Sequence, residues 1–143
     1  PNPYFKYIQE YSKKNRKKKK RKKEILFVSD NMDKVFFKNN VDLQILEKVF
    51  LFYKNEILKN KVNLTIRYHP SDKKNKFKKF LKNKDIQVDN NFDLFQTLKK
   101  MDVIAGYQSM AMVVGKMFGL KTVYARYKKH PNEIPMKYID NII

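Results

Sequence analysis

The sequence predicts an α/β fold with a doubly wound, mostly parallel Rossmann-like sheet, helices on both faces and a basic N-terminal helix. Two observations predict it. Short apolar runs recur without clean alternation of apolar and polar residues, which is typical of parallel strands buried on both faces. Segments with apolar residues at helical spacing separate these runs, so right-handed crossovers would bring the strands side by side. The 143 residues suit one domain of this class.

Each element follows from the local pattern. Strands are expected where short apolar runs close on polar residues, at 25–30, 63–69, 86–88, 102–107 and 122–125. Helices are expected where apolar residues recur every three or four positions, at 42–60, 71–81, 92–98 and 109–118. A loop or short helix is expected over 31–41, and a closing helix over 133–140.

Single residues mark the ends of these helices. Ser71 and Ser109 each precede a helical pattern, so their hydroxyls can cap the first turn. Gly119 supplies a C-terminal stop for the helix that begins after Ser109. Asp72 is expected to pair with the dipole of the first helical turn after Ser71.

The N-terminal segment combines an apolar stripe with a block of positive charge. The stripe has helical spacing and consists of Tyr4, Phe5, Ile8 and Tyr11. From Lys13 to Lys23 every residue except Asn15 is basic. The sequence therefore divides into a basic amphipathic segment over residues 1–23 and a Rossmann-like domain over residues 24–143.

The charge of the whole chain points to anionic partners. Lys and Arg number 33 against 14 Asp and Glu, which gives a formal net charge of +19. Such a balance favours nucleic acid, anionic lipid or phosphorylated ligands. A bias of composition explains it equally well, because Lys and Asn are abundant throughout and Arg is scarce, as in proteins from A/T-rich genomes.

Several classes of site are excluded or disfavoured. The chain has no Cys, which excludes disulfides and thiolate metal sites, and two distant His residues disfavour zinc. Neither a P-loop nor a dinucleotide-binding glycine motif occurs. No nucleophile triad is visible, and the carboxylates that follow the strands are expected to be scattered over different loops; these are Asp30, Asp33, Asp72 and Asp89. A general base is therefore not identified, and no metal or cofactor is expected.

Candidate ligand-binding residues stand where the strands end. In a doubly wound sheet, ligands bind beyond the carboxyl ends of the strands. The polar, charged and glycine residues found there are Ser29, Asp30, Arg67, His69, Asp89, Asn90, Gly106, Tyr107, Gln108, Ser109 and Arg126. Loops are polar in any protein, so the particular residue types carry the argument.

The turn at Gly106 and Ser109 suits a phosphate. Gly106 allows a sharp turn and the close approach of a ligand. Ser109 falls at the N-cap, where a hydroxyl and the free N–H groups of the first turn meet the positive end of the helix dipole. The alternative is that Ser109 only caps its own helix.

His69 is the second candidate for a phosphate contact. Pro70 disfavours helical geometry at His69, so the imidazole sits on or just past the last rung of the strand. Strand alternation places Arg67 and His69 on one face and Tyr68 on the other. The alternative is a packing or surface role, and His130, before Pro131, is interpreted as a loop residue.

The segments RYHPSD and GYQSMAMVVGK, about forty residues apart, together with NPYF at the N-terminus, resemble a known family. They are similar to the C-terminal, donor-binding half of GT-B glycosyltransferases, and most closely to bacterial sialyltransferase-like and capsule or lipopolysaccharide enzymes. Such enzymes carry a His-Pro motif and a serine motif around the phosphate of a CMP-activated sugar. The resemblance spans nearly the whole chain, although its motifs are short.

The resemblance implies roles for individual residues. His69 would be catalytic, because it would contact the donor phosphate and stabilise the departing nucleotide. Ser109, Gln108 and Arg67 would hold the same phosphate, without a metal. Contacts to the rest of the nucleotide would come from Gly106, Tyr107, Asp89, Asn90 and Arg126.

The resemblance also implies what else the protein needs. The acceptor-binding half of such enzymes, with its acidic general base, has no counterpart in this sequence. We therefore expect nucleotide-sugar binding with little or no transfer by this chain alone, and a missing half on the same or another chain. The chain begins at Pro1, which fits a part of a longer protein.

A binding module is the alternative to an enzyme domain. The Lys13–Lys23 run would contact nucleic acid or an anionic membrane surface, and the aromatic stripe beside it suits an interface with lipid. Nucleic acid is the weaker partner, because no aromatic stacking surface or recognised motif accompanies the charge. With neither an apolar run of about 20 residues nor a signal peptide, the expected location is the cytoplasm, including the inner face of the membrane.

Overall fold

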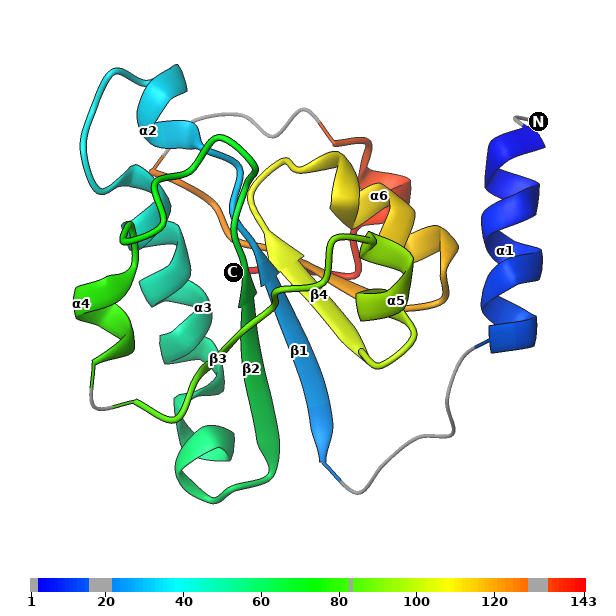
Figure 1. The fold of residues 1–143 in the computed structure, drawn as a ribbon, viewed down its shortest axis with the longest axis horizontal. Coiled ribbons are helices and arrows are strands. Elements are labelled where there is room, and N and C mark those ends of the chain that lie inside the picture. The colour runs from blue at the N-terminus through cyan, green and yellow to red at the C-terminus, as the bar shows by residue number, and fades with distance from the viewer. Residues whose placement is uncertain (1–2, 16–21, 83, 129–133) are drawn as a thin grey trace.

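The computed structural model describes residues 3–15, 22–82, 84–128 and 134–143. Within these ranges six parallel strands form one sheet in the order β3-β2-β1-β4-β5-β6 (Figure 1). The strands are β1 (Lys23–Val28), β2 (Val62–Arg67), β3 (Gln87–Val88), β4 (Val103–Gly106), β5 (Lys121–Tyr124) and β6 (Asn141–Ile142). The predicted α/β fold with a parallel sheet is confirmed.

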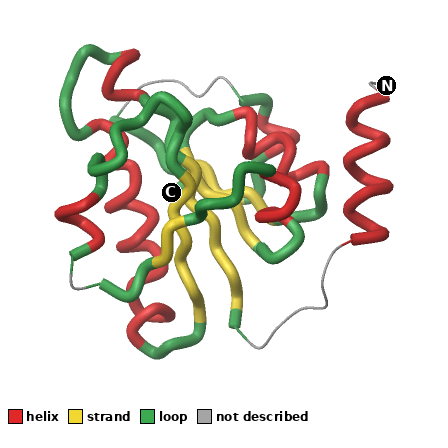
Figure 2. The backbone as a smooth tube through the Cα atoms, viewed as in Figure 1, coloured by secondary structure: helices red, strands yellow, loops and turns green. Residues whose placement is uncertain are grey.

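Helices cover both faces of the sheet (Figures 1 and 2). They are α1 (Pro3–Asn15), α2 (Met32–Val35), α3 (Val41–Leu58), α4 (Lys78–Leu81), α5 (Leu94–Leu98), α6 (Met110–Met117) and the 3₁₀ helix η1 (Met136–Tyr138). On one side α3 and α4 lie together, with the rings of Phe50 and Phe80 5.4 Å apart. On the other side α1, α5 and α6 meet where the Tyr11 ring lies 5.3 Å from Phe95 and 6.0 Å from Phe118.

The strand order reverses between β1 and β4, and we call the region beyond the carboxyl ends of these two strands the crevice. The chain moves outward from β1 through β2 to β3, then returns to the other side of β1 for β4 and moves outward again. Adjacent loops after β1 and β4 therefore leave in opposite directions, which is the usual ligand-binding position in such sheets. The buried residues of the central strand β1 are all apolar: Ile25, Leu26, Phe27 and Val28.

Helix α6 has the ends that the sequence predicts. The Ser109 hydroxyl accepts a hydrogen bond from the N–H of Ala111 at 3.1 Å. Gly119 has a φ of 100°. The N–H groups of Gly119 and Leu120 donate to the carbonyls of Lys116 and Gly115, which closes the helix in a Schellman motif.

Helix α6 also lies unusually close to β4. A Cβ added to Gly115 would be 2.7 Å from the Cγ2 atom of Ile104. Any larger residue at this position would push the helix away from the sheet. The glycine therefore helps to fix where the N-terminus of α6 lies relative to the crevice.

The helix predicted to start at Ser71 is wrong in its bounds. Residues 70–77 form turns, and the helix begins only at Lys78. The cause is Asp72, whose carboxylate accepts the N–H of His69 at 2.9 Å and binds the ammonium of Lys76 at 2.7 Å. The same contacts show that Asp72 does not pair with a helix dipole.

The closing helix predicted over residues 133–140 is also wrong. The described part of that segment contains the short η1 helix, and β6 follows it. The Asp140 carboxylate accepts the N–H of Thr122 at 2.8 Å and binds the Lys116 ammonium at 2.7 Å. These contacts hold the segment in an extended course, where β6 can pair with β5.

The N-terminal helix α1 packs against the domain. Ile8 is fully buried and Ser12 is 6% exposed, and the Ser12 hydroxyl donates to the carbonyl of Phe118 at the end of α6. Tyr4 and Tyr7 are half exposed, and the Tyr7 ring lies 6.4 Å from that of Phe95. None of the helices in the described ranges has the length and apolar character needed to cross a membrane.

The buried side of α1 predicts a contribution to stability. Replacing Ile8 by Ala should lower the free energy of unfolding by about 2–5 kcal/mol, because the change leaves a cavity under α1. Lys6→Ala, on the exposed side of the same helix, is the control and should change it by about 0.5 kcal/mol or less. Urea unfolding measures both. Equal, small effects of the two substitutions would show that α1 does not belong to the cooperative unit.

Candidate functional site

The crevice between β1 and β4 holds a group of polar side chains around Asp30. Asp30 follows β1, Gln108 and Ser109 follow β4, and His69 follows β2. The backbone N–H of Gln108 donates to Asp30 Oδ2 at 2.7 Å. The Ser109 hydroxyl and His69 lie close enough to Asp30 to influence its charge. We call these four residues the Asp30 cluster.

The surroundings of Asp30 disfavour its charge. Burial is the largest influence and raises the pKa of its carboxyl group to about 6. Asp42 also raises this pKa, whereas the hydrogen bond from Gln108 and the proximity of Ser109 and His69 lower it, and the value of about 6 is the net result. A carboxyl group of this kind changes its protonation close to neutral pH.

His69 is held by its own loop with one ring nitrogen left to donate. Its Nδ1 atom accepts the N–H of Ser71 at 3.0 Å, and its backbone N–H donates to Asp72 at 2.9 Å. A neutral imidazole that accepts at Nδ1 carries its proton on Nε2. The Nε2–H group is therefore available as a hydrogen-bond donor.

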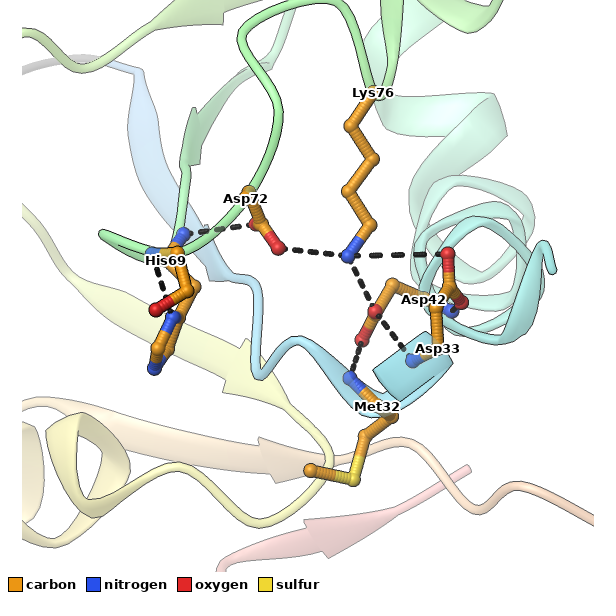
Figure 3. A network of polar contacts seen from close by, with 7 residues as sticks. Met32, Asp33, Asp42, His69, Asp72 and Lys76 are labelled. Carbon is orange, nitrogen blue, oxygen red and sulfur yellow. Dashed lines mark hydrogen bonds and ion pairs between the residues drawn. The ribbon is translucent and has the colours of Figure 1, made fainter. Parts of the chain in front are cut away.

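A buried lysine links the loop of His69 to the loop after β1. Figure 3 shows Lys76 between Asp72 on one side and Asp33 with Asp42 on the other. The Lys76 ammonium lies 2.5 Å from Asp42 Oδ2, 2.7 Å from Asp72 Oδ1 and 3.9 Å from Asp33 Oδ2. Burial alone would lower the pKa of Lys76, but its hydrogen bonds to Asp42 and Asp72 outweigh burial and raise it.

The two carboxylates on the far side of Lys76 also hold the start of α3. Asp42 accepts the N–H groups of Met32 at 3.0 Å and Asp33 at 3.1 Å, and Asp33 in return accepts the N–H of Asp42 at 3.0 Å. Asp33 and Asp72 lie in different segments, as expected, but contrary to the expectation of scattered carboxylates both meet Lys76, together with Asp42. The sequence carries no signal for this arrangement, because Asp33, Asp42 and Asp72 belong to three different segments.

Arg67 and Asp89, both predicted ligand contacts, bind each other. Arg67 Nη1 lies 2.5 Å from Asp89 Oδ2, and the guanidinium group also donates to the carbonyls of Asn91 and Phe92. Burial would raise the pKa of Asp89, but hydrogen bonds from Thr97 and Arg67 hold it below its usual value. In this structure the pair organises the loop after β3.

The other predicted ligand contacts lie outside the Asp30 cluster. Asp89 and Asn90 line a pocket of about 630 Å³ together with Tyr68. Tyr107 is buried, with its ring stacked on Tyr124 at 5.8 Å. The Arg126 side chain is exposed, and its backbone carbonyl accepts a hydrogen bond from Lys48. The structure thus brings His69, Gln108 and Ser109 together and places Tyr107, Asn90 and Arg126 at other positions along the strand ends.

Gly106 has a packing reason for lacking a side chain. A Cβ at this position would be 3.0 Å from both Cγ2 and the carbonyl oxygen of Val28 and 3.3 Å from the sulfur of Met112. Gly106 therefore allows β1 and α6 to approach β4 closely, rather than a ligand. Its φ is not positive, so no sharp left-handed turn requires the glycine.

Lys76 is the residue that sequence reasoning missed. Asp30 was named among the residues at the strand ends, but its contacts could not be predicted, because they depend on β4 being the neighbour of β1. His130 lies outside the described residues. Among the residues that the structure describes, no group of three or more His, Asp or Glu side chains could hold a metal ion.

Comparisons with known proteins give matches only among solved structures. No protein-family profile and no curated protein matches the chain. The chain is similar to KpsC, a beta Kdo 2,4 transferase of Thermosulfurimonas dismutans, with 11% identity, a TM-score of 0.53 and coverage of 99% of this chain and 50% of that chain. It is similar to the UDP-GlcNAc 2-epimerase of Methanocaldococcus jannaschii, with 16% identity, a TM-score of 0.55 and coverage of 95% and 37%.

A third similar structure is the wall teichoic acid polymerase TagF soaked with CDPG, with 19% identity, a TM-score of 0.50 and coverage of 87% of this chain and 28% of that chain. The chain thus spans half or less of the length of these structures. At such low identity the likeness shows the fold alone. This chain has a Rossmann-like fold that also forms a part of these three proteins, as the resemblance to the GT-B type implies.

The contacts of Lys76 predict a large effect on stability. Lys76→Met should lower the free energy of unfolding by about 3–5 kcal/mol, because it leaves Asp42 and Asp72 buried without their counter-charge. Lys73→Met is the matched control, since Lys73 is exposed on the same loop. Chemical denaturation measures both variants. A loss below about 1 kcal/mol for Lys76→Met would mean that the ion pairs do not hold the two loops together.

Proposed function

We propose that this chain is the donor-binding domain of a glycosyltransferase that uses a nucleotide-activated sugar, with CMP as the nucleotide. The observation that carries the proposal is the convergence of His69, Gln108 and Ser109 at the N-terminus of α6, in the crevice between β1 and β4. Capsule or other surface polysaccharide synthesis is the proposed setting.

The donors of this site suit a phosphate group. The N-terminus of α6 supplies the positive end of an eight-residue helix, whose Ala111 and Met112 N–H groups donate to Ser109. His69 adds its Nε2–H, and the Ser109 hydroxyl and the Gln108 N–H add two further donors. Hydrogen-bond donors from two chain segments, the loop after β2 and the start of α6, thus suit one anion.

The same donors suit the departure of a nucleotide. When the bond between the sugar and the phosphate breaks, negative charge grows on the phosphate oxygen. A hydrogen bond from His69 Nε2 and the dipole of α6 would stabilise this charge without needing a metal ion. The acceptor and the general base would belong to another half of the enzyme, on the same or another chain.

The solved structures support the choice of ligand class. KpsC is a Kdo transferase, and the epimerase structure is a complex with UDP-GlcNAc and UDP. The TagF structure was obtained after a soak with CDPG. The specific choice of CMP rests on the similarity of RYHPSD and GYQSM to sialyltransferase-like motifs.

The alternative, a basic module for nucleic acid or an anionic membrane, stays a prediction. Most of the Lys13–Lys23 run lies outside the described residues. Within the described part, Tyr4 and Tyr7 are half exposed on α1, which suits contact with a membrane surface as an addition to donor binding.

Nucleotide binding should stabilise the protein measurably. CMP at ~100 times its Kd should add about 2.7 kcal/mol to the free energy of unfolding, and a panel of CMP, CDP, UDP and GDP would identify the base. His69→Ala and Ser109→Ala should reduce the thermal shift caused by the nucleotide. Ser71→Ala is the control, because it removes a hydroxyl from the same loop and keeps the backbone N–H that holds His69.

The comparison uses the shift of each variant relative to its own nucleotide-free form, because Ser109→Ala also loses the helix cap, worth about 1 kcal/mol. No shift of the wild-type protein with any of the four nucleotides would contradict the proposal. A shift that His69→Ala and Ser109→Ala both retain in full would place the nucleotide elsewhere.

A further inference from the structure

The proposed phosphate site contains a carboxylate of the protein itself. Asp30 Oδ2 accepts the Gln108 N–H at 2.7 Å, and the Ser109 hydroxyl lies close enough to lower the pKa of Asp30. These are two of the donors that a phosphate would use. The negative group of Asp30 therefore stands where a negative ligand has to bind.

An ionised Asp30 and a bound phosphate would repel each other. Two negative groups that share a partly buried site cannot both stay charged without a large penalty, and the usual outcome is that one of them takes up a proton. A protonated carboxyl group also gains an O–H donor, so its contact with a phosphate oxygen changes from repulsion to a hydrogen bond.

We propose that Asp30 takes up one proton when a phosphate binds between His69 and Ser109, so that this site binds its ligand together with a proton. The inference rests on the proposed function, since it concerns the same site. The proton comes from the solvent and forms one O–H bond on the Asp30 carboxylate. It returns to the solvent when the ligand leaves.

The groups that face Asp30 support this step. Asp42 from α3 adds negative charge, His69 from the loop after β2 adds positive charge when protonated, and Gln108 and Ser109 add uncharged donors. Burial raises the pKa of Asp30 to about 6 before any ligand binds. The Asp30 carboxylate can therefore take up a proton near neutral pH, and the negative charge of a bound phosphate would favour this protonation further.

Proton uptake by Asp30 determines how the affinity for the phosphate ligand changes with pH. Above pH 6 the free protein has an ionised Asp30, and binding requires the protonated form. The affinity should then fall about tenfold for each unit of pH between about 7 and 8, since the protonated fraction falls tenfold. Below pH 6 Asp30 adds little further dependence, because it is already protonated before the ligand binds.

Calorimetry tests the proposal directly. CMP and inorganic pyrophosphate are titrated into the wild-type protein in two buffers with different enthalpies of ionisation, at about pH 7 and 8. The wild-type protein should take up about one proton more per ligand than Asp30→Asn, and its affinity should fall about tenfold more steeply between the two pH values. Asp85→Asn, at an exposed position, makes the same change of charge and should behave as the wild type.

The comparison with Asp30→Asn removes the protons taken up by His69 and by the ligand itself. Equal proton uptake and equal pH dependence in the wild-type protein and Asp30→Asn would overturn the inference. So would a variant that binds more weakly by the same factor at both pH values, because Asp30 would then act only through its position.

A second measurement needs no variant. The side-chain carboxyl carbon of Asp30, followed by NMR, should titrate near pH 6 in the free protein and at higher pH with ligand present. Proton-linked binding of pyrophosphate without binding of CMP would contradict the proposed function and keep this inference. If neither ligand binds to the wild-type protein at about pH 6, both are overturned.

Discussion

The ion pairs of Lys76 are the interaction on which the candidate site depends. One ammonium group, largely buried, lies between Asp72 in the loop after β2 and Asp42 at the start of α3. Asp72 in turn holds the backbone of His69, and Asp42 holds the loop that follows Asp30. Because isolated charges of this kind are costly to bury, the two loops can satisfy them only in this arrangement. The position of His69 relative to Asp30 thus follows from electrostatics outside the crevice.

The strongly positive chain places a negative group at the centre of its proposed phosphate site. The net charge of +19 attracts any polyanion without selecting one. Selection needs groups with defined geometry, which Ser109, Gln108 and His69 would supply in the proposed site. Asp30 adds a condition to binding, because its own charge has to be removed. The overall charge therefore contributes attraction for polyanions, and the local site contributes selection among them. Only the selection depends on the fold.

The sequence predicts what local patterns decide. Short apolar runs identify the strands, and the N-cap at Ser109 and the stop at Gly119 follow from single residues whose chemistry suits those positions. The failures share one cause. The start of a helix at Ser71 and a closing helix are overridden by Asp72 and Asp140, whose partners lie elsewhere in the chain. The Asp30 cluster likewise depends on β4 lying beside β1, which no local pattern specifies.

The central claim is that a nucleotide phosphate binds at the N-terminus of α6 and not on the lysine-rich surface. The most direct measurement is a set of ¹H–¹⁵N spectra of the labelled protein during addition of CMP at moderate salt. The account predicts that the largest changes occur in the amide signals of Gln108, Ser109 and Met110 and in the Nε2 signal of His69. Changes confined to residues 1–23, or spread over exposed lysines and lost as salt is added, would contradict it.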